Sequence, residues 1–231
     1  MSEMKLYTAA GRFVHKRDNS GQSYPIIIQG NREFLVDPQE FMIWINANWR
    51  ICRWEEIGKY YAVSAAEAGY HNDRSWQDCA QRLIVRGLLV CGCGETKYDA
   101  LYDLLSAMYL IPAKGRVTLR LFVVIKLALQ GKASFGAARR LFRTFKHTRG
   151  EKQILRLAKQ AMISTAEMIC CLEKGIRNIR NEYGLMDALY ADSHTTSDNI
   201  GQSAKEYSCC QQTLETIANL YVSQQLIFDR V

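Results

Sequence analysis

The chain has 231 residues, of which 48% are hydrophobic, and its 30 Lys and Arg against 23 Asp and Glu give a net charge of +7. This hydrophobic content is typical of a folded chain with a sizeable core and excludes a disordered one. Residues 114–186 carry 16 basic and 4 acidic side chains, whereas residues 1–113 carry 12 and 13. We therefore expect the middle of the chain to meet a polyanionic partner.

A β-hairpin is the first element predicted along the chain. Two short β-prone runs, at 26–28 and 34–36, flank Gly30 and Asn31, which are available for the turn. The hairpin therefore spans about residues 24–36. The polar, Gly-containing sequence before it predicts no element of its own.

Three helices are predicted after the hairpin. The first begins with Asp37 as its cap and Pro38 at its first position, and the second begins at about Arg53. The third covers about residues 73–86, with Asp73 or Ser75 as its cap and a glycine after its end. The segment "LLVCG" (88–92) then predicts a strand, and "ETKYDALYDLLSAMYLI" (95–111) predicts a further helix.

The order of hairpin, three helices and strand resembles winged-helix domains over about residues 24–111. The phrase "RLIVRGLLVCG" (82–92) is similar to the place where the third helix of such a domain runs into its wing. No second wing strand follows residue 93, so any partner of the 88–92 strand is expected to be the upstream hairpin. The same order equally resembles PqqD-like domains, which are small carriers that hold a peptide against a β edge.

Everything beyond Pro112 is predicted to be helical, apart from a polar loop at 191–203. The expected helices are 116–130, 135–148, 151–183 and 203–228. The predicted fold is thus mainly α with a small β component: a winged-helix-like domain with an N-terminal β-hairpin (1–113), followed by a basic helical bundle domain (114–231). Apolar residues in 151–183 recur in steps of three and four, which indicates helix packing, either within the chain or in a homodimer.

The basic stretch contains no Asp or Glu from Leu104 to Gly150. Placed at 100° per residue, its basic side chains share one arc of each helix and its apolar side chains the other. Solvated helix faces usually mix both signs of charge, because opposite charges four residues apart stabilise the helix. We expect the basic helix faces to bind a polyanion. Double-stranded DNA is the first candidate, and an acidic protein or an anionic membrane surface are the alternatives. The predicted phosphate contacts are Arg116, Arg120, Arg139, Arg140, Arg143 and Lys146.

Sequence-specific contacts, if the regulator interpretation holds, are expected from the third helix. Arg pairs with guanine and Gln with adenine, and the N-terminal positions of a recognition helix normally reach the bases. The candidates off its buried stripe are Arg74, Ser75, Gln77 and Arg82. Asp73 and Asp78 on the same helix oppose this interpretation.

No enzyme, cofactor or metal site is expected. The four histidines are isolated, and no nucleotide-binding or nucleophile-elbow motif occurs. The eight cysteines lack zinc-site spacing, and the C-x-C at Cys91 and Cys93 follows a strand without a helix to activate it. The N-terminal residues lack the apolar stretch of a secretory leader, and no apolar run reaches the roughly 20 residues that a membrane span needs. We therefore expect a cytoplasmic protein with reduced thiols.

Two functional hypotheses remain open. The first is a DNA-binding transcription regulator, which an exposed, positive third helix would favour. The second is an adaptor without catalytic activity, in which the hairpin edge holds a peptide and the basic face docks an acidic partner. Apolar side chains and free backbone groups on the hairpin would favour the adaptor.

Overall fold

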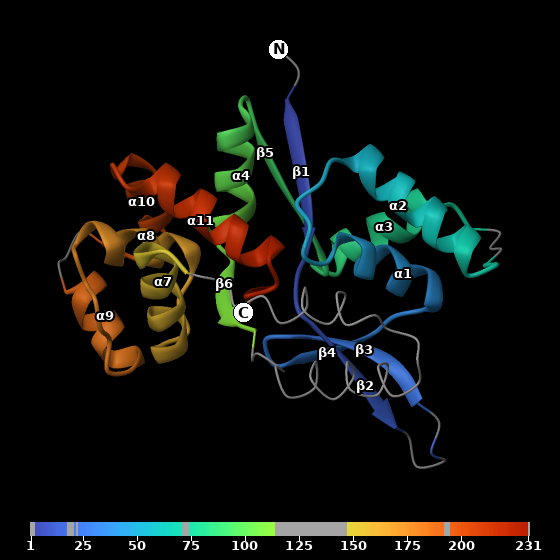
Figure 1. Ribbon diagram of the computed structural model, residues 1–231, viewed down its shortest axis with the longest axis horizontal. Coiled ribbons are helices and arrows are strands. Elements are labelled where there is room, and N and C mark those ends of the chain that lie inside the picture. Colours follow the sequence, from blue (N-terminus) through green and yellow to red (C-terminus); the bar gives the residue numbers. More distant parts are fainter. Residues whose placement is uncertain are drawn as a thin grey trace, which may run out of the picture.

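A computed structural model of the chain describes residues 3–17, 21, 23–70, 74–113, 147–191 and 195–230. These residues form nine helices and seven strands, which confirms a mainly α chain with a small β part (Figure 1). The expected helix 116–130, and 135–148 up to residue 146, lie outside the described residues. In the described part, no helix is both long and apolar enough to cross a membrane.

The predicted hairpin is confirmed and belongs to a three-stranded antiparallel sheet. Its strands are β3 (Ser23–Gln29) and β4 (Arg32–Leu35), and β3 pairs on its other side with β2 (Arg12–Arg17), which the sequence did not reveal. Gly30 in the turn has φ +53°, a conformation that glycine adopts without strain. The sheet order β2-β3-β4 makes β2 and β4 the edge strands.

The three predicted helices are confirmed as α1 (Pro38–Ala47), α2 (Trp54–Glu67) and α3 (Trp76–Val85). Asp37 caps α1 by accepting from the Glu40 backbone N–H, while the Glu40 carboxylate accepts from the Asp37 N–H. The helices enclose a core with the inner face of the sheet, in which Ile27 and Trp44 are fully buried.

The strand after α3 has a different partner from the one predicted. This strand, β5 (Leu89–Gly94), pairs antiparallel with β1 (Met4–Ala9) instead of the hairpin. The resulting ribbon runs between the three-helix unit and α4 (Lys97–Leu105) (Figure 1). A Cβ at Gly92 would lie 2.3 Å from the Leu104 backbone nitrogen, so glycine is what allows β5 to lie against α4.

The expected continuous helix over 151–183 is wrong, because three helices occupy that part of the chain. They are α7 (Arg149–Gln160), α8 (Thr165–Glu173) and α9 (Glu182–Tyr190). Ala161 is extended, Ser164 caps α8 in a reciprocal pair of hydrogen bonds with Glu167, and Gly175 at φ +67° follows the end of α8. Much of the apolar stripe is nevertheless buried within the chain, including Ile154 and Met168.

Two further predicted helices are shorter than expected and give way to strands. The first is α4, which ends at Leu105 and is followed by β6 (Tyr109–Pro112). In the expected helix 203–228, the structure has α10 (Ile200–Glu206), α11 (Cys210–Val222) and β7 (Leu226–Asp229). Gln224 has φ +62°, which turns the chain after α11 so that β7 pairs antiparallel with β6.

The buried side chains form two clusters. One lies among the β2-β3-β4 sheet, β1, β5 and helices α1 to α3, and the other joins α4 and β6 to the helices after residue 148. The ribbon strand β1 contributes to both, with Tyr7 in the first and Leu6 in the second. The division into domains at residue 113 stays a prediction, and the β6–β7 pairing crosses it.

Candidate functional site at the β4 edge

Strand β4 has one side without a strand partner among the described residues. In a hairpin with a two-residue turn, the residues that flank the turn exchange hydrogen bonds, and alternate residues do so along the ladder. Gln29 and Arg32 flank the turn, and Ile27 lies opposite Phe34. The N–H and C=O groups of the intervening residues, Glu33 and Leu35, therefore point away from β3.

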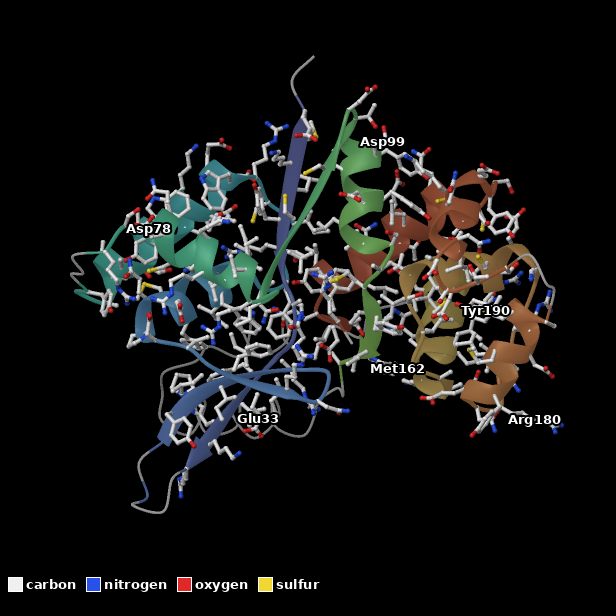
Figure 2. All side chains as sticks on the ribbon, turned by 180° about the vertical axis from the view of Figure 1, so that it is seen from behind. Glu33, Asp78, Asp99, Met162, Arg180 and Tyr190 are labelled. Carbon is white, nitrogen blue, oxygen red and sulfur yellow. The ribbon has the colours of Figure 1, made fainter. Side chains whose placement is uncertain are left out.

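Helix α3 lies beside this edge and is tied to it by Arg86, the C-cap residue. The Arg86 guanidinium donates to the Leu35 carbonyl and lies over the Phe34 ring, 5.6 Å from its centroid. Figure 2 shows Glu33 on the sheet and Asp78, in the first turn of α3, at the far side of the three-helix unit. The C-terminal end of α3 is thus the end that borders β4.

A buried carboxylate holds the arginines of α3 in place. The Glu40 side chain is only 2% exposed; its Oε1 lies 3.1 Å from Arg82 Nε and its Oε2 lies 2.9 Å from Arg86 Nη1. Arg82 and Arg86 are one turn apart on α3, so both reach the same carboxylate. Loss of the Glu40 carboxylate would be costly, because it would leave the positive charges of Arg82 and Arg86 without this counterion.

The N-terminal end of α3 is engaged in the same way. Arg74 Nη2 lies 2.9 Å from Asp37 Oδ2. Burial alone would raise the pKa of Asp37, but hydrogen bonds from the Glu40 backbone and from Arg74 hold it below its usual range. Ser75 caps α3 by accepting from the Gln77 N–H, and its hydroxyl donates to the Gln77 side chain.

The structure thus brings four predicted residues together along α3, and two of them, Arg74 and Arg82, are ion-paired to acids of α1. Sequence reasoning named the hairpin edge and placed Arg86 off the buried stripe of the third helix, but it missed Glu40 and its ion pairs with the two arginines. The spacing of Asp37 and Glu40 as a capping pair, and of the two arginines four residues apart, was the available signal. The predicted phosphate contacts lie outside the described residues: Arg116, Arg120, Arg139, Arg140, Arg143 and Lys146.

Apolar side chains remain exposed on the elements that border this edge. Leu35 on β4 is 64% exposed, and Val85 in the last turn of α3 is 80% exposed. Strand β2, at the opposite edge of the sheet, instead reads "RFVHKR", and Lys and Arg protect strand edges from unwanted pairing. The β4 edge is therefore the better suited of the two to accept another strand.

The described ranges contain no group of three or more His, Cys, Asp and Glu side chains placed to hold a metal ion. Comparison of the chain with protein-family models, with curated proteins and with solved structures found no match.

Proposed function

We propose that the chain is a peptide-binding adaptor that accepts an extended segment of a partner protein beside α3, along the edge of β4 that pairs with no strand in the described part of the chain. The observation that carries this proposal is the pair of outward-facing N–H groups of Glu33 and Leu35 next to an exposed apolar side chain. Addition of a strand gives affinity through main-chain hydrogen bonds and specificity through alternate side chains. The order of a three-stranded sheet and three helices supports the PqqD-like resemblance over the winged-helix one.

The charges of α3 also favour the adaptor. Base-reading arginines need free guanidinium groups, whereas Arg74 and Arg82 already have carboxylate partners. An incoming strand leaves both of these ion pairs in place, and it would replace only the Arg86 guanidinium at the Leu35 carbonyl. It would meet Leu35 with an apolar side chain, and Arg82, which is 56% exposed, with an acidic one. We therefore expect the bound segment to alternate apolar and acidic residues.

The experiment is selection of binders from a displayed random-peptide library, followed by fluorescence anisotropy with a selected peptide and the full chain. Glu33→Pro removes the outward-facing N–H of β4, a position where an edge strand tolerates proline. We expect about tenfold weaker binding, which corresponds to loss of roughly one hydrogen bond.

Two controls isolate the backbone group. Glu33→Ala removes the side chain, including its 2.7 Å ion pair with Lys16, and keeps the N–H. Arg17→Pro makes the equivalent change on the β2 edge, because Arg17 lies opposite Ser23 at a position that does not donate to β3. Both should bind the peptide as wild type does. Equal affinity of Glu33→Pro and Glu33→Ala would sink the proposal.

Nucleic-acid binding is the second candidate, and the acid-free stretch from Leu104 to Gly150 is the observation that favours it. Each neutralised phosphate releases counterions, so binding by this stretch would weaken steeply with salt. The test is anisotropy with a random-sequence duplex over a salt series, comparing wild type with Arg139→Glu/Arg140→Glu/Arg143→Glu. A steep salt slope that flattens in the triple variant supports a phosphate grip, and no binding at low salt removes this candidate.

A further inference from the structure

The segment Cys91–Gly94 alternates cysteine and glycine along strand β5, and the two residue types face opposite sides of the ribbon. The glycine side packs against α4: a Cβ at Gly94 would lie 2.4 Å from the Ala100 backbone nitrogen, as close as at Gly92. Packing of α4 against the glycines therefore turns both cysteines to the other side.

On that side the two thiols meet. The Cys91 and Cys93 sulfur atoms are 3.8 Å apart, and both residues are half-buried. In the β1–β5 register, Cys91 lies opposite Tyr7 and Cys93 lies opposite Lys5. Lys5 and Tyr7 also line a cavity of about 710 Å³ together with Trp54, but neither thiol lines it. Cys93 itself lines a second cavity of about 580 Å³, which gives a small molecule room to reach it.

We propose that Cys91 and Cys93 form a redox-active dithiol that a low-molecular-weight disulfide converts to an intramolecular disulfide. The Cys93 thiolate, opposite the Lys5 ammonium, attacks one sulfur of the reagent; a mixed disulfide forms and one thiolate leaves. The Cys91 thiol loses its proton to solvent and attacks the Cys93 sulfur, which expels the second thiolate. Two thiols of the protein are thereby oxidised, and the reagent is reduced to two thiols.

The surroundings assign the two roles. Burial raises the pKa of Cys91 to about 11, although a hydrogen bond from the Tyr7 hydroxyl opposes the shift. Burial thus makes Cys91 a poor first nucleophile, whereas Cys93 lines a cavity that the reagent can enter, so Cys91 is the thiol that resolves the mixed disulfide. Tyr7, whose own pKa is raised first by burial and then by its hydrogen bond to Cys91, remains protonated throughout.

The expected disulfide is strained and readily reduced. Two residues apart on a strand, the Cα atoms are separated by roughly 6.6 Å, near the upper limit of about 6.8 Å that a disulfide spans. Closing the bond therefore shortens the strand at Gly92. Strained disulfides have more oxidising potentials than structural ones, so this pair would respond to its redox surroundings.

The test is equilibration of the full chain in glutathione buffers from fully reduced to fully oxidised, with alkylation and mass spectrometry. Trypsin cuts after Arg86 and Lys97, so both cysteines fall on the peptide 87–97. We expect this peptide to lose two hydrogens and to escape alkylation in oxidised buffer, and to recover both thiols on reduction. Cys91→Ser should stop at a glutathione adduct on Cys93, whereas Cys209→Ser, at another half-buried cysteine, should behave as wild type.

Several outcomes would overturn the proposal. One is that peptide 87–97 retains two alkylatable thiols in fully oxidised glutathione. Another is that it carries a glutathione on each cysteine. Disulfides between this peptide and another cysteine would contradict it equally. None of these results bears on peptide binding at the β4 edge, which involves neither thiol.

Discussion

Replacement of Glu40 by Gln tests the electrostatic arrangement that holds α3 beside β4. Glutamine keeps the shape of the side chain and accepts the same hydrogen bond from the Asp37 backbone, so the cap of α1 survives. The amide oxygen can replace Oε2, so the 2.9 Å contact to Arg86 becomes a neutral hydrogen bond, whereas the amide –NH2 replaces Oε1 and the 3.1 Å ion pair with Arg82 is lost.

The magnitude follows from these two contacts. A hydrogen bond to a charged group contributes about 1.5–3 kcal/mol and a neutral one about 1 kcal/mol, so the Arg86 contact loses roughly 1 kcal/mol. The Arg82 contact is an ion pair without hydrogen-bond geometry, and its loss costs roughly another 1 kcal/mol. Arg82 is 56% exposed and regains hydration, while Arg86 is only 26% exposed and regains less. We therefore expect the free energy of unfolding to fall by about 2 kcal/mol.

Urea unfolding followed by circular dichroism measures this loss. The matched control is Glu56→Gln on α2, because Glu56 is also the capping-box glutamate of its helix and accepts from the Arg53 N–H at 2.7 Å. The control should change stability by less than about 0.5 kcal/mol. If both variants unfold at the same urea concentration, the ion pairs of Glu40 do not stabilise the fold and the reasoning is refuted.

Three further changes are expected to alter stability. Tyr221→Phe should lower the free energy of unfolding by about 1–3 kcal/mol, because the buried Tyr221 hydroxyl accepts from the Trp49 N–H at 2.9 Å and donates to the Ala9 carbonyl at 3.2 Å. A thermal melt measures the loss, and the control Tyr183→Phe, at an exposed tyrosine, should leave the melting temperature unchanged. Gly92→Ala should destabilise the fold by more than about 2 kcal/mol, since its Cβ would clash with the backbone of α4. Gly150→Ala in α7 has no atom within 4 Å of its Cβ and should instead stabilise the fold by about 0.5–1 kcal/mol, and urea unfolding measures both changes. The lowered pKa of Asp37 means that its contribution to stability is complete above its unfolded pKa near 4 and is lost as the pH falls through the folded value. In urea titrations at successive pH values, Asp37→Asn should therefore show a shallower loss of stability in acid than wild type, and parallel curves would contradict this.

Local signals predicted most of the N-terminal elements. Asp37 and Pro38 marked the start of α1, Ser75 marked the start of α3, and the turn at Gly30 joined two β-prone runs. Each of these features is decided by a few neighbouring residues, which is why the sequence was sufficient. The pairing of β5 with β1 was not predictable, because it joins residues at least 80 positions apart and depends on the glycine contacts with α4.

In the C-terminal part, the apolar residues keep a helical period across the ends of separate helices, so the sequence predicted one long helix instead of several. The apolar stripe from Ile154 onward continues through Ala161 although the backbone there is extended, because the separate helices turn similar faces toward one core. Strands β6 and β7 are short and apolar, and such runs read as helix or strand until a pairing partner is known. The ion pairs of Glu40 were missed for a related reason: Glu40 is a capping residue in the sequence, and only the fold shows that two arginines from α3 share its carboxylate.

Amide hydrogen exchange at β4, measured by NMR on the full chain without and with a selected peptide, tests peptide binding at this edge most directly. We predict that the Glu33 and Leu35 amides exchange fast in the free protein, because both point away from β3, and become protected in the complex. The Arg17 amide, which points away from β3 on the β2 edge, should exchange equally fast in both states. Protection of Glu33 and Leu35 in the free protein, or unchanged exchange at saturating peptide, would contradict the proposal.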